Sequence, residues 1–354
     1  LDLSVNVAKA KREMKLPIFD KKREREILDW VTESSGDYDS YSRLFFLTLF
    51  DLSKTLQNQI LAEDGELTHE VRAAILPSSE TFPKNVSVAV QGTEGAYSQQ
   101  AADKLFSMGK LNYYTTFRDV FDAVDKGQCE FGILPIENSV HGSVNEVYQL
   151  MNEYSFYIVR SVKQFINHEL LAKAETSMED IKEIFSHSQA IGQCSNFLDS
   201  LENVKVTPFK NTALAAKEVA ENSDIGIAAI SSHSCKELYN LKSINANIQN
   251  SNNNYTRFIV ISKDMKIYPG SNKITLVLST PHRPGGLYAV MAQFAALGLN
   301  LTKLESHPIP GKDFNFQFYF DIEASVTEEE TLRLLENLKL ECDNFHFLGN
   351  YMEQ

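Results

Sequence analysis

The hydrophobic pattern of the chain changes its period twice, and this limits the available folds more than any other feature. Residues 1 to about 62 show helical periodicity and contain no convincing strand. From Val86 to about Lys263, short apolar strands alternate with helices. After residue 270 the order is strand, helix, strand, strand, helix, strand. We therefore expect a multidomain protein with domains at 1–62, 84–263 and 270–354, and a linker at 63–83.

The first block is expected to be an all-α domain of three helices. Helical periodicity runs through LSVNVAKAKREM, DKKREREILDWVTE and the segment from Tyr41 to Leu61, with breaks at Pro17 and at SSGDYDS. The third helix is apolar on more than one side, which indicates packing against other helices, including those of a second subunit. Because Leu1 falls within a helical pattern, we expect that further helical residues precede it.

The other two blocks are expected to combine helices with sheets. In the middle block, five apolar strands alternate with five helices, which predicts an α/β domain of two lobes with a cleft. The β-α-β-β-α-β order of the third block is typical of a ferredoxin-like α+β sandwich.

Charge and cysteine usage exclude several classes of function. The net charge of −13 argues against a nucleic-acid binder, and means that an anionic substrate would need a locally positive pocket. No apolar stretch approaches the roughly 18 residues of a membrane span. The cysteines are far apart and form no CxxC pair, so we expect no disulfide framework or metal site, but reduced thiols in a cytoplasmic protein. These are Cys129, Cys194, Cys235 and Cys342.

Small and amide-bearing residues follow the expected strands of the middle block in four stretches. These are QGTEGAYSQQA, PIENSVHGSVNEVY, FSHSQAIGQCSNFL and NNNYTRF. Each places such residues at an expected helix start, where free N–H groups suit an anion, although any one alone could be only a helix cap. No Ser-His-Asp spacing, nucleotide loop or metal-ligand cluster appears. The remaining possibility is that hydroxyls, amides and one arginine position a substrate.

Thr256 and Arg257 lie where a loop leads into the apolar run FIVI, a place where α/β folds often bind ligands. On the residues alone, the arginine could be a solvated strand end or an anion clamp. An arginine can hold a carboxylate with two hydrogen bonds, and a neighbouring threonine hydroxyl can hydrogen-bond or relay a proton.

The stretches PIENS, FSHSQAIGQCSNFL and TRF resemble signature stretches of prephenate dehydratases, and VAVQGTEGAYS resembles the opening strand of that domain. The resemblance implies a bilobed fold like that of periplasmic binding proteins, with the active site in the cleft. It also implies a lyase that converts prephenate to phenylpyruvate, with loss of carbon dioxide and water and without a cofactor.

The same resemblance assigns roles to individual residues. It implies that Thr256 assists departure of the ring hydroxyl and that Arg257 binds a substrate carboxylate. His233 stands where relatives often carry a glutamate. Three further matched positions are polar and line the cleft: Asn138, Ser186 and Gln193. Glu137 matches an acidic position whose role stays open between catalysis and structure.

On composition, the stretch AKAKREMKLPIFDKKRERE is a solvated helical face with i, i+4 ion pairs. Its KAK, PIFD and RE segments also resemble the helical chorismate mutases that are fused ahead of prephenate dehydratases. The resemblance implies a pericyclic rearrangement, with donors that stabilise charge on the ether oxygen. It also implies two arginines before Leu1, without which the mutase site is incomplete. The matched positions are Lys11, Asp20, Arg23, Glu24, Ser53 and Gln57.

The stretch RPGGLYAVMAQFAALGLNLTKLESHPIPG resembles the ACT regulatory domain attached to prephenate dehydratases. On the residues alone, its glycine pair could be only a tight turn. The resemblance implies feedback inhibition by L-phenylalanine bound between paired ACT domains. His307 stands where the family has arginine, and Tyr288 where it has a small aliphatic residue. The implied binding positions are Gly285, Gly286, Leu287, Asn300, Leu301, Glu305 and Ser306.

Together these resemblances cover nearly the whole chain, in the order mutase, dehydratase, sensor. They imply a cytoplasmic bifunctional chorismate mutase/prephenate dehydratase of phenylalanine biosynthesis that forms a homodimer or a higher homo-oligomer. Two alternatives stay open. One is a dehydratase whose helical block serves only dimerisation, and the other is a module that binds a small anion without turnover.

Overall fold

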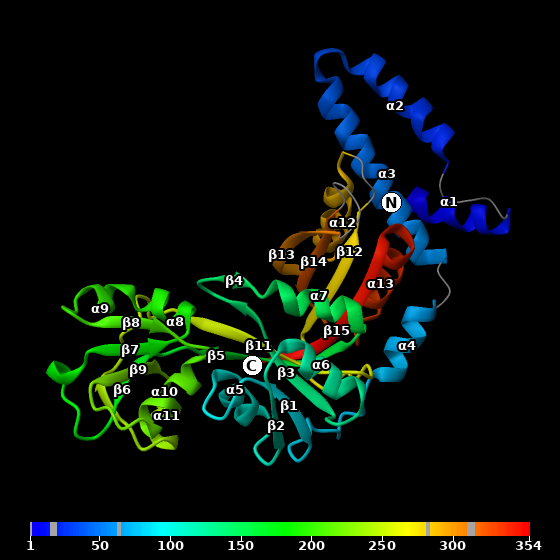
Figure 1. Ribbon diagram of the computed structural model, residues 1–354. Helices are drawn as coiled ribbons and strands as arrows, with labels where there is room; N and C mark the ends of the chain where they lie inside the picture. The colour runs from blue at the N-terminus through cyan, green and yellow to red at the C-terminus, as the bar shows by residue number, and fades with distance from the viewer. Residues whose placement is uncertain (1, 15–19, 62–64, 281–283, 310–315) are drawn as a thin grey trace. The chain divides into compact units, whose positions relative to one another are not determined.

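The computed structural model of the chain describes residues 2–14, 20–61, 65–280, 284–309 and 316–354 (Figure 1). It divides into two compact units. The first combines Leu1–Pro77 with Pro269–Tyr351, and the second combines Ser78–Tyr268 with Met352–Gln354. The helical block and the third block, expected as separate domains, therefore belong to one unit.

The helical block contains the three expected helices, in which α1 and α2 both contact α3 (Figure 1). A short 3₁₀ turn at Gly36–Tyr38 separates α2 from α3 within the segment SSGDYDS. Pro17, which was expected to separate the first two helices, lies outside the described residues. The helices are α1 (Asp2–Glu13), α2 (Lys21–Ser35) and α3 (Asp39–Leu61).

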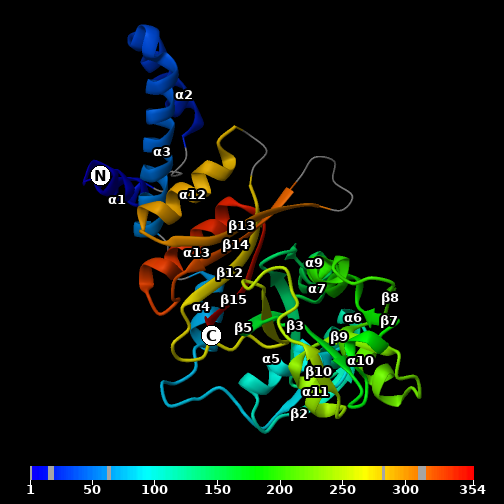
Figure 2. The same ribbon diagram turned by 90° about the vertical axis from the view of Figure 1, so that its left-hand side faces the viewer.

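The third block has the expected β-α-β-β-α-β order (Figure 2). Its antiparallel strands follow the order β13-β14-β12-β15, which is the ferredoxin-like arrangement. Phe294 of α12 packs edge-on against Phe320 of β14. The elements are β12 (Lys273–Ser279), α12 (Gly286–Ala296), β13 (Asn300–Pro308), β14 (Phe316–Glu323), α13 (Glu329–Glu341) and β15 (Asp343–Glu353).

The expected linker contains a helix, α4 (Glu66–Ala74), which contacts α13. Its N-terminus is capped by Glu336 of α13, whose carboxylate accepts hydrogen bonds from the N–H of Thr68 at 2.9 Å and from its hydroxyl at 3.0 Å. A carboxylate suits this position because the first N–H groups of a helix have no partner within the helix. Gly65 precedes the helix, and a Cβ there would lie 2.0 Å from Glu336 Oε1.

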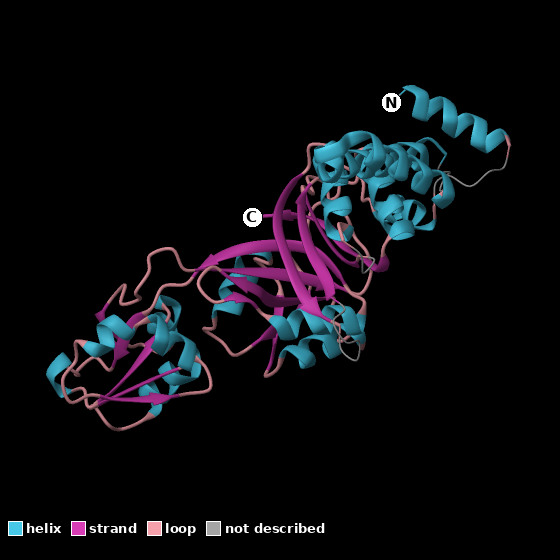
Figure 3. Cartoon of the chain, turned by 90° about the horizontal axis from the view of Figure 1, so that it is seen from above, coloured by secondary structure: helices cyan, strands magenta, loops and turns pink. Residues whose placement is uncertain are grey.

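The second unit has two lobes (Figure 3). The first lobe is a mixed sheet of order β5-β11-β3-β1-β2, in which β11 is antiparallel to both β3 and β5, and the short β4 pairs with β3. Residues 352 and 353 of β15 pair in parallel with β5. The elements are β1 (Ser87–Gln91), α5 (Tyr97–Leu105), β2 (Lys110–Tyr114), α6 (Phe117–Asp125), β3 (Phe131–Asn138), β4 (Gly142–Ser143), α7 (Asn145–Tyr154), β5 (Tyr157–Phe165) and β11 (Tyr255–Ser262).

The second lobe is a five-stranded sheet of order β10-β6-β9-β7-β8. The chain enters it after β5 and returns before β11, so the lobes are connected by two segments, at 166–168 and 246–254. The helix expected over SQAIGQCSNFLDSL is broken at Cys194. The elements are β6 (Glu169–Ala172), β7 (Glu183–Ser186), α8 (Ser188–Gln193), α9 (Ser195–Asp199), β8 (Lys205–Pro208), α10 (Thr212–Glu221), β9 (Ile227–Ser231), α11 (His233–Leu238) and β10 (Lys242–Asn245).

Candidate active site

Adjacent strands of the first lobe bring polar side chains to one face of its sheet. Thr256 on β11 is paired in register with Asn138 on β3 and with Gln164 on β5. Asn138 Nδ2 donates to Thr256 Oγ1 at 3.0 Å and to Asn254 Oδ1 at 2.9 Å. Thr256 is only 9% exposed, and its oxygen is the acceptor of this bond. The threonine O–H is therefore available to donate to a ligand.

The second lobe adds Gln193, the last residue of α8. Its Nε2 lies 3.2 Å from Nδ1 of His141, and its Oε1 lies 2.8 Å from Nε2 of His168. Nδ1 of His141 also lies 3.2 Å from Asn138 Oδ1. A chain of hydrogen-bonding contacts thus runs from Thr256 through Asn138, His141 and Gln193 to His168. We call this chain the interlobe network, because it joins side chains of both lobes.

Burial keeps His168, the last residue of the interlobe network, neutral. Desolvation lowers the pKa of His168, against a smaller opposing effect of its hydrogen bond with Gln193. With the ring neutral, its Nε2–H donates to Gln193 Oε1. Tyr97 lies edge-on to this ring and donates its hydroxyl to the carbonyl of Asn167, and burial raises its pKa. The Gln193 amide is consequently oriented with its N–H₂ group toward His141.

Arg257 lies on the opposite face of the sheet from Thr256, because successive residues of a strand alternate in direction. It is paired in register with Glu137 and Lys163. One guanidinium nitrogen lies 3.2 Å from Glu137 and another 3.6 Å from Glu353, whose second oxygen is 2.9 Å from Lys163. The guanidinium is thus engaged by carboxylates on the face away from Thr256, and the expectation that Arg257 binds a substrate carboxylate stays a prediction. Glu137, whose role was open, is its ion-pair partner.

Ser186 also lies outside the interlobe network. It is completely buried at the end of β7, and its hydroxyl donates to the carbonyl of Ile230 on β9 at 2.7 Å. The next residue, His187, caps the N-terminus of α8 by accepting from the N–H of Gln189. Ser186 thus fixes the start of the helix that carries Gln193. Its hydroxyl donates to the backbone of β9 and is not directed at a ligand.

Several buried polar atoms of this unit have no hydrogen-bond partner within the described ranges. They include Gln164 Oε1, beside Thr256 in the sheet, and Glu169 Oε2. The other carboxylate oxygen of Glu169 lies 2.9 Å from His233, so an acid does reach the position where His233 departs from relatives. Unpartnered buried polar atoms are uncommon and cost about 1–3 kcal/mol each, which favours a polar ligand nearby.

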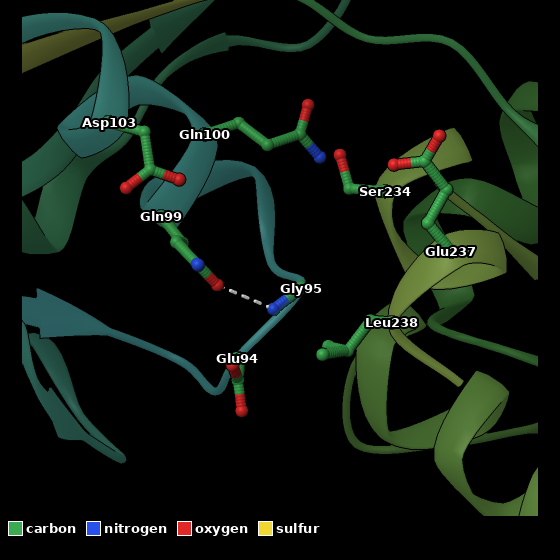
Figure 4. Close-up of a pocket in the computed structure, with 8 residues that line it drawn as sticks. All are labelled: Glu94, Gly95, Gln99, Gln100, Asp103, Ser234, Glu237 and Leu238. Carbon is green, nitrogen blue, oxygen red and sulfur yellow. Dashed lines mark hydrogen bonds between the residues drawn. The ribbon is translucent and has the colours of Figure 1, made fainter. Parts of the chain in front are cut away.

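A cavity of about 230 Å³ lies between the start of α5 and α11 (Figure 4). Burial raises the pKa of Asp103 in its wall. Three carboxylates in the lining disfavour an anionic ligand by repulsion, so this cavity is a poor candidate for the expected substrate. Its lining residues are Glu94, Gly95, Gln99, Gln100, Asp103, Ser234, Glu237 and Leu238.

In the helical block, the structure joins two of the expected mutase residues. Gln57 Nε2 donates to Ser53 Oγ at 3.0 Å, and this oxygen donates to Ser4 of α1 at 2.8 Å. Glu24 lies 3.4 Å from Lys54 of α3. These contacts bring α1, α2 and α3 together around polar groups.

The remaining mutase positions are engaged locally. Asp20 caps α2 by accepting from the N–H of Arg23, whose exposed guanidinium pairs with Glu26 at 3.2 Å. Lys11 is half-buried on α1.

The expected effector positions lie on two adjacent elements, α12 and β13. Gly285 caps α12 with a φ of 82°, a conformation that favours glycine, and Gly286 and Leu287 follow in the helix. The other positions lie along β13: Asn300, Leu301, Glu305 and Ser306.

Neighbouring side chains engage these positions. Asn300 donates to Glu323 at 2.6 Å, and Glu305 lies 3.3 Å from His307. Tyr288 Oη lies 3.4 Å from Thr48 of α3.

Other expectations concern absences and cysteines. The described part of the chain contains no group of His, Cys, Asp and Glu side chains suited to a metal ion. None of its helices is both long enough and apolar enough to traverse a bilayer. All four cysteines are free and buried.

Comparisons with known proteins identify the family and its relatives. A family model described as prephenate dehydratase matches residues 88–266. A bifunctional chorismate mutase/prephenate dehydratase of Enterobacter agglomerans is 30% identical over 99% of this chain and 89% of its own length. An arogenate dehydratase/prephenate dehydratase of Arabidopsis thaliana is 34% identical over 78% of this chain and 75% of its own. A crystal structure of prephenate dehydratase in complex with L-Phe from Arthrobacter aurescens superposes with a TM-score of 0.68 at 27% identity, covering 75% of this chain and 89% of that one.

Proposed function

The chain belongs to the prephenate dehydratase family, and we propose that the interlobe network is its dehydratase site. The carrying observation is that Thr256, Asn138 and Gln193, three positions implied by the family resemblance, are connected through His141 across the two lobes. The enzyme is a bifunctional chorismate mutase/prephenate dehydratase of phenylalanine biosynthesis, since its relatives of that description align over 99% of the chain.

The chemistry requires little more than orientation and a donor. In prephenate, the bond between ring and carboxylate breaks, its electron pair enters the ring, and the ring hydroxyl leaves as the ring becomes aromatic. The Thr256 hydroxyl, held by Asn138 Nδ2, donates a hydrogen bond to the departing oxygen. The amide of Gln193 orients the substrate from the second lobe.

Arg257 acts as a positioning residue in this proposal. The residue is 8% exposed and its guanidinium is paired with Glu137, so it holds β11 in place next to β3. Ser186 has a similar supporting role, since its hydroxyl ties β7 to β9.

We assign the mutase activity to the helical block and propose that Ser53, Gln57 and Lys11 face chorismate there. The Ser53–Gln57 hydrogen bond supports the expected pairing of polar groups on α3. Tyr41, Leu44 and Phe45 of α3 are exposed apolar side chains, which supports a homo-oligomer formed through this helix.

We further propose that L-phenylalanine inhibits the enzyme by binding at the N-terminus of α12 and along β13. The Arthrobacter aurescens relative was solved with L-Phe, and Gly285 gives a ligand close access to the backbone N–H groups.

A coupled assay tests the mutase activity, the dehydratase activity and the inhibition by L-phenylalanine. The full chain is incubated with chorismate, or with prephenate, and phenylpyruvate is followed by ultraviolet absorbance with and without L-phenylalanine. We expect product from both substrates and a lower rate with L-phenylalanine. Product from prephenate alone would leave a dehydratase whose helical block serves assembly, and prephenate binding without product would leave a non-catalytic module. Arogenate is the control substrate, because the Arabidopsis thaliana relative is named for it.

A further inference from the structure

We propose that His141 is a catalytic residue of the dehydratase: its imidazolium donates the proton with which the ring hydroxyl leaves as water. This inference rests on the proposed function and extends it, because His141 is not among the positions that the family resemblance assigned. Its imidazole lies in the interlobe network, and its two nitrogens differ in their hydrogen-bond partners.

The backbone holds His141 in a fixed position. The N–H groups of Val140 and His141 both donate to Asn138 Oδ1 at 3.0 Å. Ser139 attaches the same turn to the segment before β11, since its hydroxyl donates to the carbonyl of Asn253 at 2.8 Å and its N–H donates to that of Tyr255 at 2.8 Å. The imidazole therefore stands beside Asn138 on a rigid turn between β3 and β4.

Nδ1 of His141 has both a donor and an acceptor within reach. Asn138 Oδ1, an acceptor, lies 3.2 Å away, and Gln193 Nε2, a donor in the orientation set by His168, also lies 3.2 Å away. A charged imidazolium donates its Nδ1–H to Asn138, and the neutral ring that remains after Nε2 has given up its proton keeps Nδ1–H and this hydrogen bond. A general acid must be stable before and after it gives up its proton, and this site provides a partner for each state.

Nε2 of His141 has no hydrogen-bond partner in the part of the chain that the structure describes, and the residue is exposed. This nitrogen can therefore reach a ligand, and solvent can return its proton after each turnover. Thr256 and His141 contact opposite ends of the Asn138 amide, through Nδ2 and Oδ1 respectively. One amide thus positions both a hydroxyl donor and an imidazole.

The proposed step balances as follows. The bond between the ring and its carboxylate breaks, carbon dioxide leaves, and the electron pair becomes part of the aromatic ring. The ring C–O bond breaks with its pair on oxygen, and the proton from His141 Nε2 completes a water molecule. His141 is left neutral and takes up a proton from solvent. Thr256 alone cannot supply this proton at neutral pH, because a hydroxyl is too weak an acid, whereas imidazole changes charge between pH 5 and 8.

The other titratable groups around His141 are already committed. Burial lowers the pKa of His168, so it is neutral and donates to Gln193. His187 of the second lobe accepts the N–H of Gln189. Glu137 and Arg257 pair with each other on the opposite face of the sheet.

The test compares two substitutions of His141 in the full chain with prephenate as substrate. In His141→Asn the amide occupies about the place of Nδ1, and in His141→Gln about the place of Nε2. Neither amide can transfer a proton. For His141→Asn we expect kcat to fall about 10²-fold or more with KM changed far less. For His141→Gln, which keeps a hydrogen-bond donor toward the substrate, we expect a smaller loss.

The pH profile distinguishes proton donation from a structural role. Wild-type kcat should fall as the pH rises, because the proposed step needs a protonated His141, and this fall should be absent in both variants. His69→Asn, an exposed histidine on α4, is the matched control and should keep the wild-type profile. Melting temperatures of the variants show that they fold.

The outcomes separate this inference from the proposed function. Wild-type turnover of prephenate establishes the dehydratase, whatever the variants do, and its absence refutes both. If the wild type turns over and folded His141→Asn keeps kcat within about twofold with the pH limb intact, His141 is not the acid. Full rescue by His141→Asn but not by His141→Gln would show that only the Nδ1 contacts matter, which also overturns the proposal.

Discussion

At the scale of residues, two neighbours in the sequence have different tasks because they lie on opposite faces of β11. Thr256 faces Asn138 and the interlobe network, whereas Arg257 faces Glu137 and Glu353. Arg257 is 8% exposed and ion-paired. Removing one partner of such a pair destabilises the fold, because it leaves an uncompensated buried charge. Its substitution should therefore affect stability at least as much as substrate binding.

We expect Arg257→Lys to lower the free energy of unfolding by about 1–3 kcal/mol, because an ammonium does not reproduce the planar fork that reaches two carboxylates. Glu353→Gln should have a similar effect, and the double variant should lose less than the sum of the two. Denaturant unfolding measures the stability terms, and prephenate kinetics are run alongside. A large rise in KM for prephenate at unchanged stability would instead restore Arg257 as a carboxylate ligand.

The buried His168 predicts a pH dependence of stability. Its pKa is lowered in the folded state by burial, so below about pH 6.5, the usual histidine value, the unfolded chain binds a proton that the folded chain does not. Stability should thus fall as the pH drops from 7.5 to 5.5. His168→Gln should flatten this dependence. His346→Gln is the comparison variant, because burial lowers the pKa of His346 too. If stability in His168→Gln depended on pH as steeply as in the wild type, His168 would not be the source of this dependence.

Sequence reasoning identified Asn138, Gln193 and Thr256 but not the histidines that connect them. His141 was visible within PIENSVHGS, three residues after Asn138, but only the fold shows that Gln193 reaches it from the other lobe. The sequence also did not show that Thr256 and Arg257 start on opposite faces of β11, which follows from the alternation of side chains along a strand.

At the scale of elements, strands with long apolar runs were predictable, whereas the short interior strands β6 and β7 and the strands at sheet edges were not. The apolar segments of β1, β3, β5, β9 and β11 agree with the structure. The strands β2, β8 and β10 end their sheets and carry sequences such as KLNYY and KVTP, which bury less and show no apolar run. The helix α4 was missed because its cap comes from Glu336, far away in the sequence.

The contact between Glu336 and α4 gives a prediction at this scale. Gly65→Ala would place a methyl group within 2.0 Å of the Glu336 carboxylate and push it away from Thr68. We expect a loss of about 1–3 kcal/mol in stability, and a smaller loss for Glu336→Gln, which keeps an acceptor oxygen. Chemical denaturation measures both. Gly192→Ala, within α8 and with open space for a Cβ, is the control and should not lower stability. Stability equal to wild type in Gly65→Ala would contradict the cap.

At the scale of the whole molecule, the order of the three blocks was predictable, whereas their grouping was not. The change from helical to alternating to β-α-β-β-α-β pattern marks the blocks in the sequence. Nothing in that pattern indicates that the first and third form one compact unit, or that residues 352–354 belong to the other. Both facts depend on contacts between residues that are distant in the sequence.

In the proposed mechanism, the Thr256 hydroxyl, which Asn138 holds on the sheet of the first lobe, helps to expel the oxygen of the bound ring. The most direct measurement is the kcat and the dissociation constant for prephenate of full-length Thr256→Val, beside Thr256→Ser. We predict that Thr256→Val binds prephenate within a few-fold of wild type while kcat falls about 10²- to 10³-fold, and that Thr256→Ser retains most activity. Unchanged kcat in Thr256→Val, or a loss that falls entirely on binding, would contradict the central claim.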